Sequence, residues 1–432
     1  MDRRSPKLLS PPTLAKLFIT RLVEITEATK TVAITEISKI PSRLNIQINV
    51  FIRLIMRTVG KRSMEQKMRN LTLGALAISL SACLEPQPAP DISKRPMSAF
   101  NVEVIAEGLK HPWSVAQSGS DYYVSQRAGQ LYRLSAAGRQ EIKGLPNDIY
   151  VAGQGGLFDV RIDGGQLYIS YAYGTAKSNG TALISAKIAG DELVETKTLF
   201  RANPPKDTSA HFGGRIALLP DGTLALTTGD GFKYREAAQD VKSHLGKTLR
   251  LTRDGGAPSD NPKLGGVGEV YSYGHRNVQG LAYDKETGQL WSHEHGPRGG
   301  DELNLISAGA NYGWPIASKG LDYNGAKITP HETYKGMEDG VHVWTPSIAA
   351  SGLAIYRGEM FPEWNGDALI GGLVSKDVRR VDLENGKSIG EVSLLSDLDA
   401  RVRDVRVSSD GAVLVLTDAP ENGKLLRITP KG

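Results

Sequence analysis

A histidine beside two glycines is the first candidate for chemistry in this 432-residue chain. The segment 211–215 reads His-Phe-Gly-Gly-Arg and leads into an apolar, strand-like run. Such a histidine can stand at a loop-lined face, and its ordinary pKa of about 6.5 suits a general base. The alternative is a hydrogen-bonded loop histidine, and the segment taken alone favours that alternative.

A second candidate group lies at His293-Glu294-His295, which a Gly-Pro turn follows. His293 and His295 are separated by one residue at a strand end, so their side chains face the same side. Without a third histidine nearby, however, they predict a zinc site only weakly. The turn at Gly296 and Pro297 exposes backbone carbonyl groups instead, and such hard oxygen ligands suit calcium.

Two arginines, Arg401 and Arg403, stand one residue apart in a strand-like run. Alternate residues of a strand share a face, so both guanidinium groups are expected on one side. Paired arginines aimed at one place suit a polycarboxylate ligand, because each can form charge-assisted, bidentate hydrogen bonds. A solvated strand end is the alternative that the sequence leaves open.

The elements that must position these residues are predicted to be short β-strands. From Phe100 onward, alternating apolar runs are broken by Gly, Asp and Asn, often after turn signals such as those at 221–222 and 410–411. The pattern recurs six times without long amphipathic helices, and six four-stranded units of about 55 residues would fill residues 100–432. We therefore predict an all-β, six-bladed propeller of four-stranded antiparallel blades, with a β-sandwich as the alternative. A strand at Asn101–Ile105 is expected to close the ring in the last blade and hide its edge.

The charge of the chain is unevenly distributed. The net charge is +5, but residues 1–82 hold 14 basic and 5 acidic residues, which leaves 38 basic and 42 acidic residues in the other 350. The folded part is therefore mildly acidic, which argues against a nucleic-acid partner. Those 350 residues also hold 46 of the 48 glycines, as many tight turns require. The single cysteine excludes intrachain disulfides and Cys-based metal sites.

Residues 64–82 have the pattern of a signal peptide. Lys67 and Arg69 precede an apolar run of about ten residues, too short for a transmembrane helix. The run ends at Leu-Ser-Ala-Cys, which resembles a bacterial lipobox with Cys83 as the lipidated residue. We expect a periplasmic protein with a lipid anchor to the outer membrane, or a soluble periplasmic form without it. Residues 83–99 read as a Pro-rich tether, and residues 1–63 as a non-native extension upstream of a start at Met64 or Met68.

Many ordered segments together resemble the soluble quinoprotein aldose sugar dehydrogenases of the glucose/sorbosone dehydrogenase group. The resemblance runs from Gly108 to Ile428. It rests on segments 108–113, 153–157, 211–215, 273–277, 294–297, 311–315, 344–349, 401–406 and 416–418.

The resemblance implies a propeller that holds pyrroloquinoline quinone (PQQ) and a calcium ion on its loop face, and that oxidises aldoses at C1 to lactones by hydride transfer to PQQ. It implies that His211 is the general base and that Gly296 and Pro297 bind calcium, which polarises the quinone. The physiological electron acceptor stays unknown. The residues implied to contact the cofactor are Gln154, Arg276, Asn277, Trp344, Arg401 and Arg403, with Arg276 also counted as catalytic.

Three departures from the family pattern affect the expected site. Ala210 precedes His211 where the glucose dehydrogenase relatives have an acidic residue, so the sequence does not show what orients the base. Val374 occupies the place of a family lysine, and Lys376, expected on the same strand face, is the candidate substitute. His295 replaces a glutamine near the calcium ligands.

Two alternative functions remain open at this point. One is a catalytically silent propeller that binds a sugar or a protein, and the other is a calcium-dependent lactonase. The lactonase would need carboxylate and Asn ligands clustered around its metal, and the sequence presents no clustered set.

Overall fold

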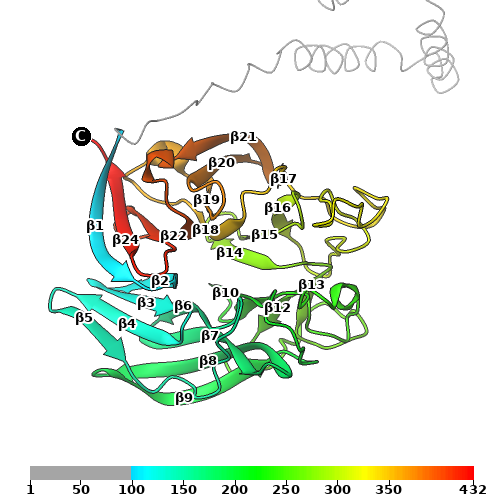
Figure 1. Ribbon diagram of the computed structural model, residues 1–432, viewed down its shortest axis with the longest axis horizontal. Coiled ribbons are helices and arrows are strands. Elements are labelled where there is room, and N and C mark those ends of the chain that lie inside the picture. Colours follow the sequence, from blue (N-terminus) through cyan, green and yellow to red (C-terminus); the bar gives the residue numbers. More distant parts are fainter. Residues whose placement is uncertain (1–98) are drawn as a thin grey trace, which may run out of the picture. The chain divides into compact units, whose positions relative to one another are not determined.

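The described residues, 99–432 of this computed structural model, form six four-stranded antiparallel sheets that follow one another around an axis (Figure 1). The predicted signal peptide, Cys83 and nearly all of the tether lie outside these residues. No helix within 99–432 is long and apolar enough to cross a membrane.

Each sheet is one blade, numbered here from 1 to 6. Blade 1 contains β2 (Pro112–Ser118), β3 (Asp121–Gln126), β4 (Gln130–Ser135) and β5 (Gly138–Ile142). Blade 2 contains β6 (Leu157–Asp163), β7 (Gln166–Thr175), β8 (Ser178–Ala189) and β9 (Glu192–Arg201). Blade 3 contains β10 (Gly213–Leu218), β11 (Leu224–Thr228), β12 (Lys247–Leu251) and β13 (Val270–Tyr273).

The second half of the ring repeats this arrangement. Blade 4 contains β14 (Val278–Asp284), β15 (Gln289–Glu294), β16 (Asp301–Ile306) and β17 (His342–Trp344). Blade 5 contains β18 (Ala350–Ile355), β19 (Ala368–Gly372), β20 (Val378–Glu384) and β21 (Lys387–Leu394). Blade 6 has the order β1 (Phe100–Leu109), β24 (Gly423–Pro430), β23 (Val413–Thr417) and β22 (Val402–Val407). Short 3-10 helices lie in the connections: η3 (Arg235–Ala238), η4 (Pro362–Trp364) and η5 (Ser396–Leu398).

The strands β2, β6, β10, β14, β18 and β22 form the inner ring, where each contacts the next and β22 contacts β2. This confirms the predicted six-bladed propeller. The predicted closing strand is also confirmed, since β1 pairs antiparallel with β24 in a register that sets Val102 opposite Ile428. The pairing joins the first strand of the ring to the last and covers an edge that would otherwise be open.

The strand positions follow from the pattern of apolar residues and turns. The second strands β11, β19 and β23 are buried along their whole length, because a blade packs on each side of them. The turns before β11 and β23 contain Gly222 and Gly411 with φ values of 81° and 90°. That left-handed conformation favours glycine, so the predicted Asp-Gly turns are explained by the backbone.

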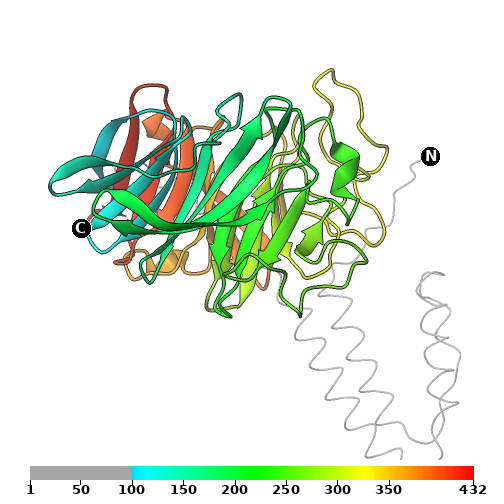
Figure 2. The same cartoon turned by 90° about the horizontal axis from the view of Figure 1, so that it is seen from below.

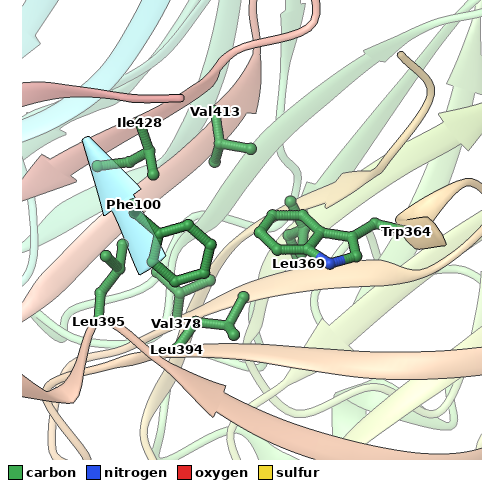
Figure 3. Close-up of a pocket in the computed structure, with 8 residues that line it drawn as sticks. All are labelled: Phe100, Trp364, Leu369, Val378, Leu394, Leu395, Val413 and Ile428. Carbon is green, nitrogen blue, oxygen red and sulfur yellow. The ribbon is translucent and has the colours of Figure 1, made fainter. Parts of the chain in front are cut away.

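Apolar side chains fill the space between blades 5 and 6. The rings of Phe361 and Trp364 stack with centroids 4.0 Å apart, and Phe100 of β1 meets Trp364 edge-on. A gap of about 10 Å³ remains beside Phe100 and Trp364, lined by apolar side chains (Figure 3). A gap of this size without polar groups is a packing defect rather than a ligand site.

The axis of the ring is filled by charged side chains in ion pairs. Arg215 of β10 is fully buried, and its Nη1 donates to Oδ1 of Asp404 on the opposite inner strand β22 at 2.7 Å. The other oxygen of Asp404 accepts from the backbone of Val115 in blade 1, at 3.2 Å. Asp159 of β6 accepts from Ser114 Oγ at 2.6 Å and from Ile216 N at 2.9 Å. These carboxylates therefore join four inner strands at the centre.

Removal of one partner of the axial ion pair should destabilise the whole ring. The variant Asp404→Ala leaves Arg215 buried without its carboxylate, which typically costs about 3–5 kcal/mol in free energy of unfolding. The control is Arg133→Ala, which breaks a partly exposed pair with Asp191 and should cost less than about 1 kcal/mol. Urea unfolding followed by tryptophan fluorescence measures both losses, and equally small losses would contradict the central role of the pair.

Candidate active site

The predicted site residues gather where the inner strands begin. His211 lies just before β10, Arg276 and Asn277 directly precede β14, and Arg401 directly precedes β22. Because the inner strands surround one axis and run from the same face, their starts meet at one end of it. Figure 2 shows the propeller turned by 90° from the view of Figure 1. The connections from the second to the third strand of each blade return to this same face.

His211 is buried and forms a close pair with Asp230, which follows β11. The His211 Nδ1 atom lies 2.6 Å from Asp230 Oδ1. A carboxylate only accepts hydrogen bonds, so Nδ1 carries the proton and Nε2 keeps its lone pair. The imidazole is thus held in the tautomer in which Nε2 can accept a proton.

The surroundings of His211 favour its neutral form. Burial lowers the pKa of His211, and the nearby cations Arg276 and Lys206 act in the same direction. Asp230 opposes them, because its carboxylate stabilises the protonated ring. The ring is therefore neutral, and ready to accept a proton, at neutral pH.

Asp230 is itself fixed by hydrogen bonds, and sequence reasoning missed it. Its Oδ2 accepts from the indole N–H of Trp314 at 2.8 Å, and its Oδ1 accepts from the backbone of Phe232 at 2.7 Å. The β10–β11 hairpin returns the chain from His211 to Asp230, and a bulge between Gly213 and Ile216 shifts its register so that Gly213 pairs with Thr228. The sequence does not show that bulge. The acidic partner sought at Ala210 is supplied by the neighbouring strand.

The backbone at His211 is held in an uncommon conformation. Its φ is 52°, its N–H donates to Gln154 Oε1 at 2.8 Å, and its carbonyl accepts from Gly231 N at 3.3 Å. A Cβ on Gly229 would lie 2.3 Å from the His211 carbonyl oxygen, so only glycine allows this approach. Gln154, predicted as a cofactor contact, thus holds the backbone of His211 through its side-chain oxygen, and Gln154 itself is exposed.

Arg276 lies next to His211. Its Nη1 donates to the carbonyl oxygens of His295 and Gly296 at 3.0 and 2.9 Å, and its guanidinium lies 5.3 Å from the ring centroid of Trp314. Trp314 therefore contacts both the cation and the carboxylate partner of the base. Arg276 is buried, which places a positive charge within the site.

Asn277 follows Arg276 and connects two inner strands. Its Oδ1 accepts from the backbone N–H of Gly213 at 3.3 Å and from Gln279 Nε2 at 3.3 Å. The structure therefore brings Asn277 beside the glycine turn that follows His211, where its oxygen helps to hold that turn.

Arg401 and Arg403 converge as predicted, and the group they meet is Asp418 at the end of β23. Asp418 Oδ2 lies 3.0 Å from Arg403 Nη2 and 3.6 Å from Arg401 Nη2. Its other oxygen lies 2.9 Å from His111 Nδ1. Burial lowers the pKa of Arg403, and Asp418 opposes that shift. Sequence reasoning missed the roles of Asp418 and His111, although Asp418 was part of a matching segment.

The prediction that Lys376 shares a strand face with Val374 is wrong. Both residues lie in the turn between β19 and β20, where Lys376 has a φ of 57° and its Nζ donates to Asp399 at 2.8 Å. Lys376 lines a surface pocket of about 440 Å³ together with Arg401 and Asp418.

Trp344 lies on the outer strand β17 rather than at the strand entrances. It packs in a hydrophobic cluster with Trp291 and Ile348, and its indole N–H donates to the carboxylate of Glu391 in the next blade. The structure therefore does not bring its side chain together with His211. Its backbone carbonyl accepts from Gly300 N at 2.8 Å and so supports the turn after β15.

The turn with the predicted calcium ligands lies beside Arg276. The N–H of Gly296 donates to Asp301 Oδ1 at 3.0 Å, and Pro297 next to it is buried. The preceding histidines do not offer their Nε2 atoms to a metal, because these lie 2.9 Å from the Gly352 carbonyl and 2.7 Å from the Ala350 carbonyl. In residues 99–432, side chains of His, Cys, Asp and Glu form no cluster of three that could hold a metal ion.

A buried lysine, unnoticed in the sequence, lies close enough to His211 to act on its pKa. Lys206 Nζ donates to Asn179 Oδ1 at 2.8 Å and to the Thr208 carbonyl at 2.7 Å, and it lies 3.4 Å from the ring centroid of Phe212. Burial lowers the pKa of Lys206 to about 7. Its charge contributes to the lowered pKa of His211. An isolated lysine gives no sequence signal for such a role.

Comparisons with known proteins identify relatives of this chain. The sequence model of the Glucose / Sorbosone dehydrogenase family matches residues 109–427. The aldose sugar dehydrogenase YliI of Escherichia coli is 37% identical over 372 residues, which cover 82% of this chain and 97% of the relative. A crystal structure of a glucose dehydrogenase is 38% identical and superposes with a TM-score of 0.74, over 77% of this chain and all of that one. The PQQ-bound aldose sugar dehydrogenase of Streptomyces coelicolor is 30% identical, with a TM-score of 0.63 over 76% of this chain and 98% of that one.

The fold and the residues at its loop face define a propeller oxidoreductase. The chain belongs to the glucose/sorbosone dehydrogenase family, which confirms the resemblance seen in the sequence.

Replacement of Asp230 should lower the pKa of His211 further. In Asp230→Asn the ring loses the carboxylate that stabilises its protonated form, whereas burial and the cations remain. The titration of the His211 ring, followed by NMR and assigned with His211→Gln, should therefore shift to lower pH. Asp254→Asn, which removes an exposed carboxylate, should leave it unchanged. An unchanged or raised pKa in Asp230→Asn would show that the carboxylate does not act on the base.

Proposed function

We propose that this protein is a PQQ- and calcium-dependent dehydrogenase that oxidises aldose sugars at C1 to lactones. The observation that carries the proposal is the His211–Asp230 pair, whose Nε2 keeps a lone pair at a face that also holds Arg276, Arg401 and Arg403. The names of the relatives, one of them solved with PQQ, support the cofactor and the sugar substrate.

The charges of the face fit PQQ, which carries three carboxylates. Arg401 is exposed and shares a single carboxylate, Asp418, with Arg403. Its guanidinium therefore keeps donors for a further anion. Arg276 adds a third guanidinium beside the base, where it is bound by neutral carbonyl groups. Arg276, Arg401 and Arg403 would hold the cofactor. Lys376 lines one pocket with Arg401, but its Nζ pairs with Asp399.

The carbonyl oxygens beside Arg276 fit a calcium ion. Those of His295 and Gly296 converge on one cationic nitrogen, and such hard oxygens suit calcium as well. Gly296 would therefore be a calcium ligand, together with its neighbour Pro297.

The proposed chemistry divides between the cofactor and the protein. When bound, PQQ accepts two electrons with the hydrogen of C1, and calcium polarises its carbonyl group. His211 Nε2 takes the proton of the C1 hydroxyl while the C1–H hydrogen leaves with its electron pair, and a carbonyl group forms at C1. Asp230 holds the ring in the reactive tautomer and stabilises the imidazolium that results. Trp314 keeps Asp230 and Arg276 in place, so that base and cation face the same reacting group.

Reconstitution of the purified protein with PQQ and Ca²⁺ tests the function. We expect a redox dye to be reduced with aldoses, and less so without calcium. His211→Ala should nearly abolish turnover and leave PQQ bound, because the base is lost while the arginines remain. His342→Ala, on the outer strand β17, should be fully active. A silent propeller or a lactonase would bind no PQQ and reduce no dye, and full turnover of His211→Ala would show that another group is the base.

We also propose that the protein acts in the periplasm, anchored by a lipid on Cys83. The proposal rests on the signal-peptide pattern of residues 64–83. Expressed in a bacterial host, Cys83→Ser should move from the membrane fraction to the soluble periplasmic extract. The mass of the wild-type protein should match a lipidated chain that begins at Cys83. A mature chain that retains residues 1–63, or an unmodified Cys83, would contradict the proposal.

A further inference from the structure

We propose that Phe232 and Tyr323 form an aromatic wall beside the base, and that this wall takes the apolar face of a cyclic sugar. The inference rests on the proposed function and adds how the substrate is selected. The two residues come from different blades, Phe232 from the connection after β11 and Tyr323 from the long connection between β16 and β17. Both side chains are exposed large apolar groups.

Phe232 packs against His211, and its backbone has an energetically unfavourable conformation. Its ring centroid lies 5.2 Å from that of His211, nearly perpendicular to it, and the residue is 49% exposed. Its φ is 69°, a backbone conformation that is rare for residues other than glycine, and especially for bulky ones. A residue that is both strained and apolar in solvent contributes little to folding, and strain of this kind clusters at functional sites.

The turn that carries Phe232 is fixed from several sides. The Phe232 N–H donates to Asp230 Oδ1 at 2.7 Å, and the Gly231 carbonyl accepts from Thr208 Oγ1 at 2.6 Å. Two residues further on, the Tyr234 hydroxyl donates to Asp207 at 2.9 Å. The Asp230 carboxylate therefore orients both the imidazole of His211 and the turn that carries Phe232. The ring is held in one place before any ligand arrives, which reduces the entropy lost on binding.

Tyr323 extends this surface toward Arg276. It is 60% exposed, its ring centroid lies 6.4 Å from that of Phe232, and the two ring planes differ by 33°. Its hydroxyl accepts from Arg276 Nη2 at 3.3 Å. The rings thus form an apolar surface with a polar rim of imidazole, hydroxyl and guanidinium groups.

A sugar in its ring form matches this combination. The ring carbons of a pyranose present C–H groups on one face, while the hydroxyl groups point to the rim. The C–H face of the sugar is removed from water when it packs against the aromatic rings, which is favourable. The imidazole, hydroxyl and guanidinium groups of the rim can hydrogen-bond to the sugar hydroxyls. The aromatic wall lies beside His211, which in the proposed function takes the proton of the C1 hydroxyl. A sugar bound against the wall would therefore have its C1 hydroxyl within reach of His211. We therefore infer that cyclic aldoses are bound through this contact.

The test uses Phe232→Gly, because glycine adopts the same φ without strain and removes only the ring. In the PQQ- and Ca²⁺-loaded protein, KM for glucose should rise about three- to tenfold, the range expected for the loss of one aromatic contact. The turnover number and the affinity for PQQ, measured by titration, should not change. Phe232→Tyr should restore the wild-type KM, and Tyr323→Leu, which keeps an apolar side chain without the ring, should also raise it. Ile389→Ala, which shortens another exposed apolar side chain on β21, is the matched control and should leave KM unchanged.

The outcomes separate this inference from the proposed function. A loss of PQQ affinity in Phe232→Gly with unchanged KM would assign the wall to the cofactor and overturn the inference. An unchanged KM and unchanged PQQ affinity would overturn it as well. If the proposed function itself is wrong, the wild-type protein will bind no PQQ and reduce no dye. Saturation-transfer NMR of glucose on the wild type and Phe232→Gly, without cofactor, gives a second readout, in which the transfer should weaken when the ring is removed.

Discussion

The buried ion pair between Arg215 and Asp404 is the contact on which the arrangement of the site depends. Charges without water are tolerated only when they are paired, so these two residues fix the separation of the opposite inner strands β10 and β22. Arg215 lies four residues after His211, and Asp404 directly follows Arg403. Arg215 also donates to the Arg403 carbonyl at 3.0 Å. His211 and the paired arginines are therefore held at a set distance across the axis.

The fold could be predicted from the sequence because its elements are local and repeated. Apolar runs of strand length and glycines at turns identify the blades without any long-range information. The closing strand at the N-terminal end was also predictable, since a ring must cover its own edge. The position of Lys376 was not, because the apolar residues Leu373 and Val374 continue past Gly372, at which β19 ends. Only the pairing of Gly371 with Val378 of β20 shows where the turn begins.

The site was predictable residue by residue only where a side chain belongs to a recognisable segment. His211, Arg276 and the arginine pair were found in this way. Asp230, Asp418 and Lys206 were missed because their roles arise from contacts between strands or connections. Trp344 belongs to a recognisable segment, yet its side chain fills the interior between blades. A family pattern therefore identifies a position, whereas burial and partners show what the side chain does there.

The pairing of β1 with β24 has a consequence for how the ring is made. The hydrogen bond between Asn101 and Pro430 joins residues 329 positions apart, so the last blade stays incomplete until the end of the chain has been synthesised. Closure over such a separation is entropically costly and slow compared with hairpin formation. Until then β1 is an open strand edge, able to pair with another chain. A chain shortened at its C-terminal end would therefore tend to aggregate rather than form a smaller propeller.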